Sequence, residues 1–473
     1  MAKASDQGVS LLENEKAIIA AIYASLHKCA PEALVPRGPK AHHGPRNAWY
    51  NDDCKAARQA ALLAEKTHGV GSVTTVAAFK EYKHVLKQSK KCWLDSSMDL
   101  LRVSLSKDPK SFWSKFRGNS KHKPEIDVNE WTTYFTDLFS SNSQNRVGLS
   151  ATDLVFGVDG PRGREAASCL NQEFSVSEVS CVLKKLRKNA SPGIDGLPAE
   201  FYHFAGDNNV VFSAALTSIF NRVLHEGYPN HWAASALAPV PKPKGDASNK
   251  DDYRGIAVGS SISKKFSVSP LNRLDRWAED NGLRAVGQSG FRLKRGTADA
   301  SFILNHLVDK YHNSKKPLYA AFVDFKKAYD WVNRDLLWEC LDKLGVHGAC
   351  LKALRSMYAD VTRQVRLDGF LGTPFSSDTG VKQGDPLSPL LFGLLIDRIE
   401  SFFRNKLPHI GVGMGAHILQ VLLYADDLAI MAESPQEMQL LLNCLSDFCK
   451  ASGLQVNIKK SEIVGFNSFQ RDS

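Results

Sequence analysis

The stretch that most constrains the fold is Ile418–Ala432, which reads ILQVLLYADDLAIMA. Two apolar runs flank a short polar break at Asp426 and Asp427, and this pattern predicts a tight hairpin between two buried strands. Two adjacent carboxylates are costly to bury unless a cation compensates their charge. Carboxylate oxygens suit Mg²⁺ or Mn²⁺. Asp-Asp is also ordinary turn chemistry on a surface hairpin, so the hairpin alone leaves both interpretations open.

Length and composition limit the class of protein. A chain of 473 residues with 43% hydrophobic and 23% charged residues is typical of a globular protein with two or three domains. The 60 Lys and Arg residues exceed the 50 Asp and Glu residues, and the formal charge of +10 favours a polyanionic partner such as nucleic acid. The nine cysteines lack metal-knuckle spacing, which favours reduced thiols. No signal peptide or membrane span is visible, so we expect an intracellular protein, in the nucleus or the cytoplasm.

The N-terminal third differs from the rest of the chain. We expect residues 1–165 to form a basic, mostly helical extension and residues 166–473 to form the second domain, because the Gly-, Ser- and Asn-rich stretch at 141–168 marks a boundary. Residues 49–117 are helical in character. Their lysines include Lys80, Lys83, Lys87, Lys90 and Lys91. Such a face can bind nucleic acid, and it can equally be the solvated side of a helix.

Beyond residue 166 the order of predicted elements is strand–helix, loop–helix, hairpin and helix–strand, which indicates an α+β fold. Leu318–Phe325 is a mostly apolar predicted strand that contains Asp324 near its end. If this strand lies beside the hairpin, Asp324 meets Asp426 and Asp427 at one end of a sheet. Three carboxylates around two divalent ions are the arrangement for in-line nucleotidyl transfer.

Seven stretches carry a family resemblance. In chain order they are SPGIDGLPAEFY, APVPKPKGDASNKDDYRGIAV, QSGFRLKRGTADA, FVDFKKAYDWV, GVKQGDPLSPLLF, YADD and GLQVNIKKSE. Over residues 129–468 the chain resembles the reverse transcriptase of non-LTR (LINE-like) retrotransposons. The resemblance implies a right-hand polymerase with fingers and a ferredoxin-like palm sheet. It also implies an RNA template, a DNA primer, dNTPs and two Mg²⁺ ions, with Mn²⁺ as a substitute.

The resemblance assigns roles at the carboxylates. Asp324, Asp426 and Asp427 would hold the metal ions, although Asp427 points differently from its neighbour and could act at one remove. Lys460 would be the general acid for pyrophosphate. Lys459 is an alternative to it, and both lysines could instead be solvated charges.

The resemblance also assigns the substrate side. Tyr329 would exclude a ribose 2′-hydroxyl, unless it is simply a core aromatic residue. Lys242 and Arg254 would grip the triphosphate, with Lys244 as an alternative to Lys242. The remaining predicted contacts are Phe325, Gln383 and Gly384 in the nucleotide pocket, and Arg292, Lys294 and Arg295 on the template backbone.

Two features depart from the family pattern. Gly255 stands where many relatives have proline after the arginine. The chain also stops soon after Lys460, so we expect the thumb to be missing and any activity to be weak. The alternative hypothesis is a degenerate remnant that binds nucleic acid without useful catalysis.

Overall fold

The computed structural model describes residues 49–107, 126–140, 168–184, 191–197, 210–243, 245–415 and 417–467, together with a few single residues and short pieces between them. Contacts between Cα atoms divide the chain into two units. One comprises Pro36–Lys123, and the other comprises Met1–Val35 and Pro124–Ser473. The predicted boundary between residues 165 and 166 lies outside the described residues and stays a prediction.

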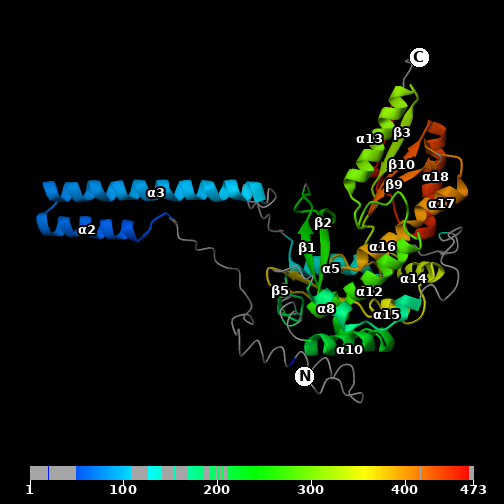
Figure 1. Ribbon diagram of the computed structural model, residues 1–473, viewed down its shortest axis with the longest axis horizontal. Coiled ribbons are helices and arrows are strands. Elements are labelled where there is room, and N and C mark those ends of the chain that lie inside the picture. Colours follow the sequence, from blue (N-terminus) through cyan, green and yellow to red (C-terminus); the bar gives the residue numbers. More distant parts are fainter. Residues whose placement is uncertain are drawn as a thin grey trace. The chain divides into compact units, whose positions relative to one another are not determined.

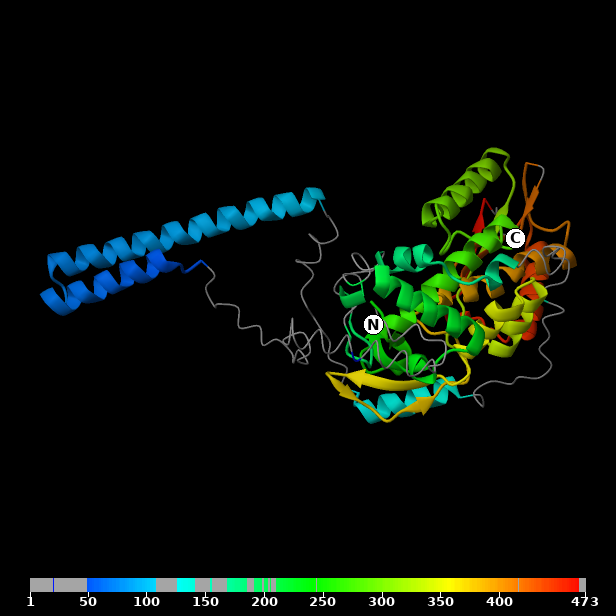
Figure 2. The same ribbon diagram turned by 60° about the horizontal axis from the view of Figure 1, so that its bottom comes forward.

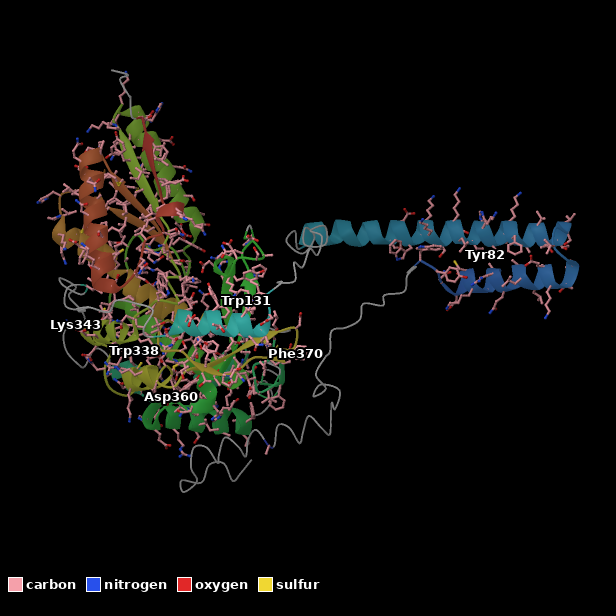
Figure 3. The ribbon with its side chains drawn as sticks, turned by 180° about the vertical axis from the view of Figure 1, so that it is seen from behind. Tyr82, Trp131, Trp338, Lys343, Asp360 and Phe370 are labelled. Atoms are coloured by element: carbon pink, nitrogen blue, oxygen red, sulfur yellow. The ribbon has the colours of Figure 1, made fainter. Side chains whose placement is uncertain are left out.

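The first unit is a helical hairpin. Its helices are α2 Asp52–His68 and α3 Val73–Lys107. The side chain of Asn51 caps α2 by accepting a hydrogen bond from the Cys54 N–H, and Gly69 ends the helix in a positive-φ conformation. Tyr82 lies between the two helices (Figure 3). The side chains of Lys80, Lys83, Lys87, Lys90 and Lys91 are all exposed on α3.

The second unit contains two main sheets and many helices. The described helices include α5 Val128–Phe139, α7 Ser168–Asn171, α8 Val176–Lys184, α10 Val210–Glu226, α11 Asn230–Ala233, α12 Ser261–Asp280, α13 Thr297–Asn313, α14 Arg334–Lys343, α15 Gly348–Ser356, α16 Ser388–Ile396, α17 Arg398–Lys406 and α18 Pro435–Ser452. The resulting mixture of helices and sheets agrees with the predicted α+β class. No helix within the described ranges is both long enough and apolar enough to cross a membrane.

The four-stranded sheet has the order β11-β3-β10-β9 and is antiparallel throughout. Its strands are β3 Leu318–Val323, β9 Val421–Tyr424, β10 Asp427–Ala432 and β11 Glu462–Phe466. Alternate residues of β3 enter two different apolar cores, because successive side chains point to opposite faces. One face packs on α18 and the other on α13 (Figure 1).

The predicted pairing of the Leu318–Phe325 strand with the hairpin is confirmed, with two corrections to the strand limits. The incoming strand of the hairpin begins at Val421 rather than Ile418, because Ile418 lies in β8 His417–Leu419, which pairs with β7 Val412–Met414. β3 ends at Val323, so Asp324 follows the strand instead of ending it.

The five-stranded sheet has the order β2-β1-β4-β5, with β6 also paired to β4. Its strands are β1 Ser235–Pro241, β2 Tyr253–Gly259, β4 Thr362–Leu367, β5 Phe370–Leu371 and β6 Phe375–Ser376. The prediction of two short strands joined by a long basic loop at 235–259 is confirmed by β1 and β2, whose loop carries the short helix η5 Lys250–Asp252.

Helix α5 covers this sheet (Figure 2). Trp131 and Phe135 pack in one core with Leu237 of β1 and Val365 of β4. The packing also explains the glycine at 255, because a Cβ there would lie 2.8 Å from the Phe135 ring. A segment expected to be part of the N-terminal extension therefore supplies core residues to this sheet.

Candidate active site

The end of the four-stranded sheet brings three carboxylates together. The register pairs Leu428 with Val323, so Asp427 and Asp324 lie opposite each other one position further along. Asp427 also pairs with Tyr424, which leaves Ala425 and Asp426 as the two-residue turn. The side chains of residues more than a hundred positions apart therefore meet because two buried strands fix their register.

The three carboxylates repel one another. The pKa of Asp426 is raised by burial and then by the negative charges of Asp427 and Asp324. The pKa of Asp427 is likewise raised by burial and by Asp324. Arg254, which is exposed on β2, acts in the opposite direction on both groups, so the five-stranded sheet brings a positive charge towards the carboxylates.

The donor set suits a hard divalent cation. Mg²⁺ takes oxygen ligands and is usually held by one or two carboxylates together with substrate phosphates and water, rather than by a complete protein cage. Within the part of the chain that the structure describes, no three His, Cys, Asp or Glu side chains form such a cage. The carboxylates of Asp324, Asp426 and Asp427 are of the ligand type that Mg²⁺ prefers, but these three side chains do not form a complete metal site by themselves.

Asp324 is held by the segment that follows α18. The Asn457 Nδ2 donates a hydrogen bond of 2.8 Å to the Asp324 carboxylate, and the Asn457 backbone N–H donates to the Asp324 carbonyl at 2.7 Å. The Asp324 N–H donates to the Ser461 hydroxyl at 3.2 Å. Asn457 lies in a stretch that supported the family resemblance, but the sequence alone gave it no role.

Gln288 holds the hairpin turn. Its side-chain oxygen accepts hydrogen bonds from the Ala425 N–H at 3.0 Å and the Gly290 N–H at 2.8 Å. Its Nε2 donates to Asp397 at 3.0 Å, and Asp397 is paired with Arg284 at 2.7 Å. Gln288 is 0% exposed and Ala425 has a φ of +60°, so a buried polar chain fixes a turn that has an uncommon backbone conformation.

The segment around Gln288 also forms an extra edge for the sheet. The Ser289 N–H donates to the Leu423 carbonyl at 2.8 Å, and the Leu423 N–H donates to the Gly287 carbonyl at 2.9 Å. A Cβ at Gly287 would lie 2.4 Å from the Val421 carbonyl oxygen, and one at Gly290 would lie 2.3 Å from the Ala425 nitrogen. Glycine is therefore needed at both positions for this close approach.

Two lysines near this edge come from the β1–β2 loop and from η6 Ile458–Lys460. Lys242 is half-buried, and its pKa is lowered by burial and then by the positive charge of Lys460, so these two lysines lie near each other. Lys460 lines a groove of about 310 Å³ together with Asp324 and Asp427, and Lys459 is not among the lining residues. This placement favours Lys460 over Lys459. Lys244 lies outside the described residues.

Tyr329 has the packing of a core aromatic residue, and its role in excluding a ribose 2′-hydroxyl stays a prediction. Its ring stacks on Phe392 with the centroids 4.6 Å apart, so it is anchored to the core. Its pKa is raised by burial and then by the charge of Asp426, so the ring also lies near the carboxylates. Phe325 does not reach the site surface. It is 3% exposed, and its side chain packs in the core below Asp324.

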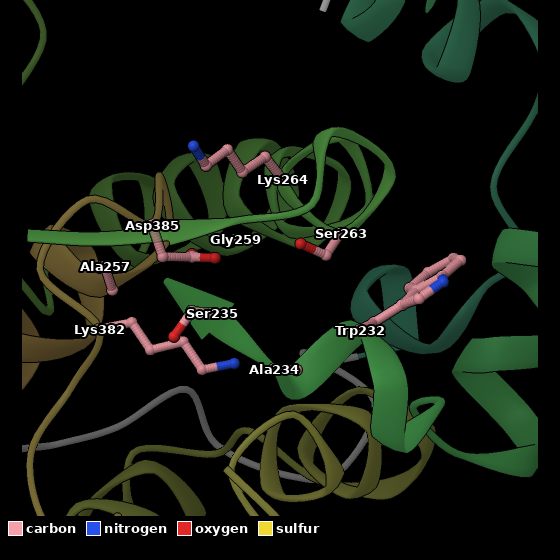
Figure 4. A pocket seen from close by; sticks show the side chains of 9 residues that line it. All are labelled: Trp232, Ala234, Ser235, Ala257, Gly259, Ser263, Lys264, Lys382 and Asp385. Atoms are coloured by element: carbon pink, nitrogen blue, oxygen red, sulfur yellow. The ribbon is translucent and has the colours of Figure 1, made fainter. Parts of the chain in front are cut away.

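Gln383 and Gly384 close on the end of β2. The Ala257 N–H donates to the Gln383 carbonyl at 2.6 Å, and Gly384 has a φ of +109°. Lys382 and Asp385 flank this pair and line a cavity of about 10 Å³, large enough for about one water molecule (Figure 4). Burial lowers the pKa of Lys382 to about 8 and raises the pKa of Asp385.

The predicted template contacts divide into two kinds. Arg292 is paired with Glu279 through hydrogen bonds of 2.7 and 2.5 Å, and its side chain is 7% exposed. Its guanidinium is therefore engaged within the fold. Lys294 and Arg295 are exposed, and Arg295 donates to the Val286 carbonyl at 2.8 Å.

Comparisons with known proteins point to a reverse transcriptase family. Residues 240–469 match the family described as reverse transcriptase (RNA-dependent DNA polymerase). The chain is 26% identical over 287 residues to the Pol polyprotein of the type-1 retrotransposable element R2 of Popillia japonica, covering 60% of this chain and 38% of that protein. It is 28% identical over 317 residues to the Pol polyprotein of element R2DM of Drosophila melanogaster, covering 67% and 28%.

A solved structure is also similar. The apo telomerase of Candida tropicalis, truncated from its C-terminal domain, matches with 15% identity and a TM-score of 0.39, covering 59% of this chain and 64% of that one. The chain spans about a third of the length of the two R2 polyproteins.

Proposed function

We propose that this chain, whose residues 240–469 match the reverse transcriptase family and which is similar to the Pol polyproteins of the retrotransposable elements R2 and R2DM, is an RNA-directed DNA polymerase. Its substrates would be an RNA template, a DNA primer and dNTPs. In this proposal the four-stranded sheet is the palm and the five-stranded sheet belongs to the fingers. The whole reaction is nucleotidyl transfer from a dNTP to the primer 3′-hydroxyl.

The observation that carries the proposal is the pairing of β3 with β10. This register gathers Asp324, Asp426 and Asp427 at one edge, where Arg254 faces them from the fingers. Two divalent cations, when bound there, would activate the 3′-hydroxyl and neutralise the triphosphate. The carboxylates would hold those cations, because a bound cation relieves the repulsion between the three negative charges.

The basic residues have complementary roles in the proposal. Arg254 would bind phosphate oxygens in a bidentate manner, and Lys242 would act as a point charge beside it. Lys460, which lines the same groove as Asp324 and Asp427, would give a proton to the departing pyrophosphate. The ring of Tyr329, anchored on Phe392, would exclude the 2′-hydroxyl of a ribonucleotide.

Primer extension tests the proposal. Wild-type protein and Asp426→Asn are given an RNA template, a DNA primer and dNTPs, with Mg²⁺ and then with Mn²⁺. Asp447→Asn is the matched control, because it makes the same change at a surface residue paired with Lys406. We expect incorporation by the wild type and the control, and a fall of about a hundredfold or more in Asp426→Asn. Equal incorporation by all three proteins would reject the catalytic role.

One observation supports a second candidate, nucleic-acid binding without useful catalysis. The five lysines of α3 named above are exposed, as a phosphate-binding helix would require. This candidate predicts salt-dependent binding of an RNA–DNA duplex by the wild type with no incorporation in either metal. Incorporation that depends on Asp426 would reject it.

A further inference from the structure

Three side chains from separate segments meet beside the active site. Tyr134 comes from α5, Asp251 from η5 in the fingers loop, and Lys327 from the palm loop that also carries Asp324 and Tyr329. The Asp251 carboxylate accepts hydrogen bonds from the Lys327 Nζ at 2.7 Å and the Tyr134 hydroxyl at 2.8 Å. The Lys327 Nζ also donates to the Tyr134 oxygen at 2.9 Å. We call this triangle of residues the latch.

The chemistry of the latch is self-consistent. The hydrogen bond from Lys327 is the largest cause of the lowered pKa of Asp251, and the pKa of Tyr134 is raised by burial and by its bond to Asp251. The Lys327 ammonium and the Tyr134 hydroxyl therefore both donate to the Asp251 carboxylate, and two of the three ammonium N–H groups have acceptors within the latch. The ammonium also lies 4.9 Å from the centre of the Tyr134 ring, which adds a cation–π contact.

The latch is connected to Lys242. The Lys242 Nζ donates to the Asp251 carbonyl at 2.7 Å, and the Lys242 N–H donates to the Asp252 carbonyl at 2.8 Å. Asp251 thus binds Lys327 through its side chain and Lys242 through its backbone carbonyl. On the palm side, the Lys327 carbonyl accepts from the Asp330 N–H at 2.9 Å, which ties it to the turn containing Tyr329.

We propose that Tyr134, Asp251 and Lys327 join the fingers loop to the palm loop and so fix Lys242 at the triphosphate side of the site. They are positioning residues, and they set the affinity for the incoming nucleotide rather than the rate of the chemical step. The functional part of this inference rests on the proposed polymerase activity. The mechanical part, that the latch orders the fingers loop, does not.

Amide hydrogen exchange tests the mechanical part in the protein without substrates. Lys327→Ala removes the ammonium, and Lys326→Ala is the matched control, because Lys326 is the exposed neighbour and its backbone bond to Gln455 stays intact. In Lys327→Ala we expect exchange in the peptide containing Lys242 and Asp252 to accelerate by about three- to tenfold. This range is set by a charge-assisted bond whose partners are 25% and 65% exposed.

Conservative variants sharpen the same measurement. Tyr134→Phe keeps the ring and removes one donor, so its acceleration should be smaller than that of Lys327→Ala. Lys327→Arg keeps the charge and should restore most of the protection. Unchanged exchange in Lys327→Ala, or equal acceleration in Lys326→Ala, would overturn the latch.

Steady-state kinetics on dNTPs test the functional part. In Lys327→Ala we expect KM for dNTP to rise by about five- to twentyfold with kcat within about twofold, whereas Lys326→Ala leaves both unchanged. A fall in kcat at constant KM would overturn the positioning role. If the wild type incorporates nothing, the proposed polymerase activity fails, and hydrogen exchange still decides whether the latch orders the loop.

Discussion

In the palm, Asp324 and Asp427 are positioned by the register of two buried strands. In the fingers, Lys242 is positioned by backbone carbonyls of the β1–β2 loop, and the latch holds that loop in turn. A strand that is buried on both faces cannot slip by one residue without moving every side chain into the opposite apolar core, where the packing does not match it. A side-chain network can be opened by one substitution. The two regions therefore differ in how precisely, and how reversibly, they position their functional groups.

This difference suggests a division of labour. In the proposed polymerase the palm would hold the groups that must be fixed before a metal binds, because electrostatic stabilisation works best when it is preorganised. The fingers would hold the groups that bind the nucleotide, which must enter and leave. Substitutions in the palm should therefore lower kcat, and substitutions in the fingers should raise KM. The predictions that follow test this division.

Apart from the three carboxylates, the largest predicted effect is at Gln288, which supports the turn of the hairpin. Gln288→Ala leaves the Ala425 and Gly290 N–H groups without their acceptor and removes one of the donors to Asp397, so kcat should fall by about ten- to a hundredfold. The free energy of unfolding should fall by about 1–3 kcal/mol, because buried polar groups become unsatisfied. Single-nucleotide incorporation and urea unfolding measure the two quantities. A rise in KM at constant kcat would place Gln288 with the fingers groups instead.

The next effect is a change in the selection of dNTP over rNTP. Tyr329→Val removes the ring proposed to exclude the 2′-hydroxyl, so the preference for dNTP over rNTP should fall by about ten- to a hundredfold. The ratio of kcat/KM for dATP and ATP measures it, with Phe325→Leu as the control because Phe325 lies in the core. An unchanged ratio in Tyr329→Val would leave Tyr329 with a packing role on Phe392 only.

Two of the predicted template contacts, Arg292 and Lys294, should differ in what their removal changes. Arg292→Ala should lower the free energy of unfolding by about 1–3 kcal/mol, because it leaves Glu279 without its partner. Lys294→Ala should not affect stability but should reduce duplex affinity by about twofold and lower its salt dependence. Thermal unfolding and a salt titration of binding measure these effects. A loss of duplex affinity without a loss of stability in Arg292→Ala would show that Arg292 leaves Glu279 to bind the template.

The smallest predicted effect concerns stability without metal. The pKa of Asp426 is raised in the folded state, so its ionised form costs folding free energy at every pH above its folded pKa. Asp426→Asn should therefore raise the free energy of unfolding in EDTA at pH 7.5 by on the order of 1 kcal/mol. The gain should disappear as the pH falls through the range where Asp426 becomes protonated. A less stable variant at pH 7.5 would show that the carboxylate makes a favourable contact.

The palm was largely predictable from the sequence. Two apolar runs around the YADD break located the hairpin. The approach of Asp324 to Asp426 and Asp427 came from the family resemblance rather than from local spacing, and the structure confirms the strand pairing on which it depends. The strand limits were less accurate, because Ile418 is as apolar as its neighbours and only its pairing with β7 removes it from the hairpin.

The fingers contacts were not predictable in the same way. Lys327 meets Asp251 and Tyr134 across 76 and 193 positions of sequence, and no periodicity relates such residues. Arg292 lies in a basic stretch that is typical of a template contact. Its guanidinium is nevertheless bound by Glu279, which lies on α12 thirteen positions earlier. Phe325 lies between site residues, but it continues the alternation of Ala321 and Val323, so its side chain enters the same core as theirs.

The most direct test of the account is the role of Asp324, the carboxylate that reaches the site only because β3 pairs with β10. Single-turnover incorporation of one dNTP is measured for the wild type and for Asp324→Asn, at saturating dNTP and Mg²⁺. The account predicts a fall of about a thousandfold in the rate with unchanged duplex affinity. A rate within a few fold of the wild type, in a variant that unfolds at the wild-type temperature, would contradict it.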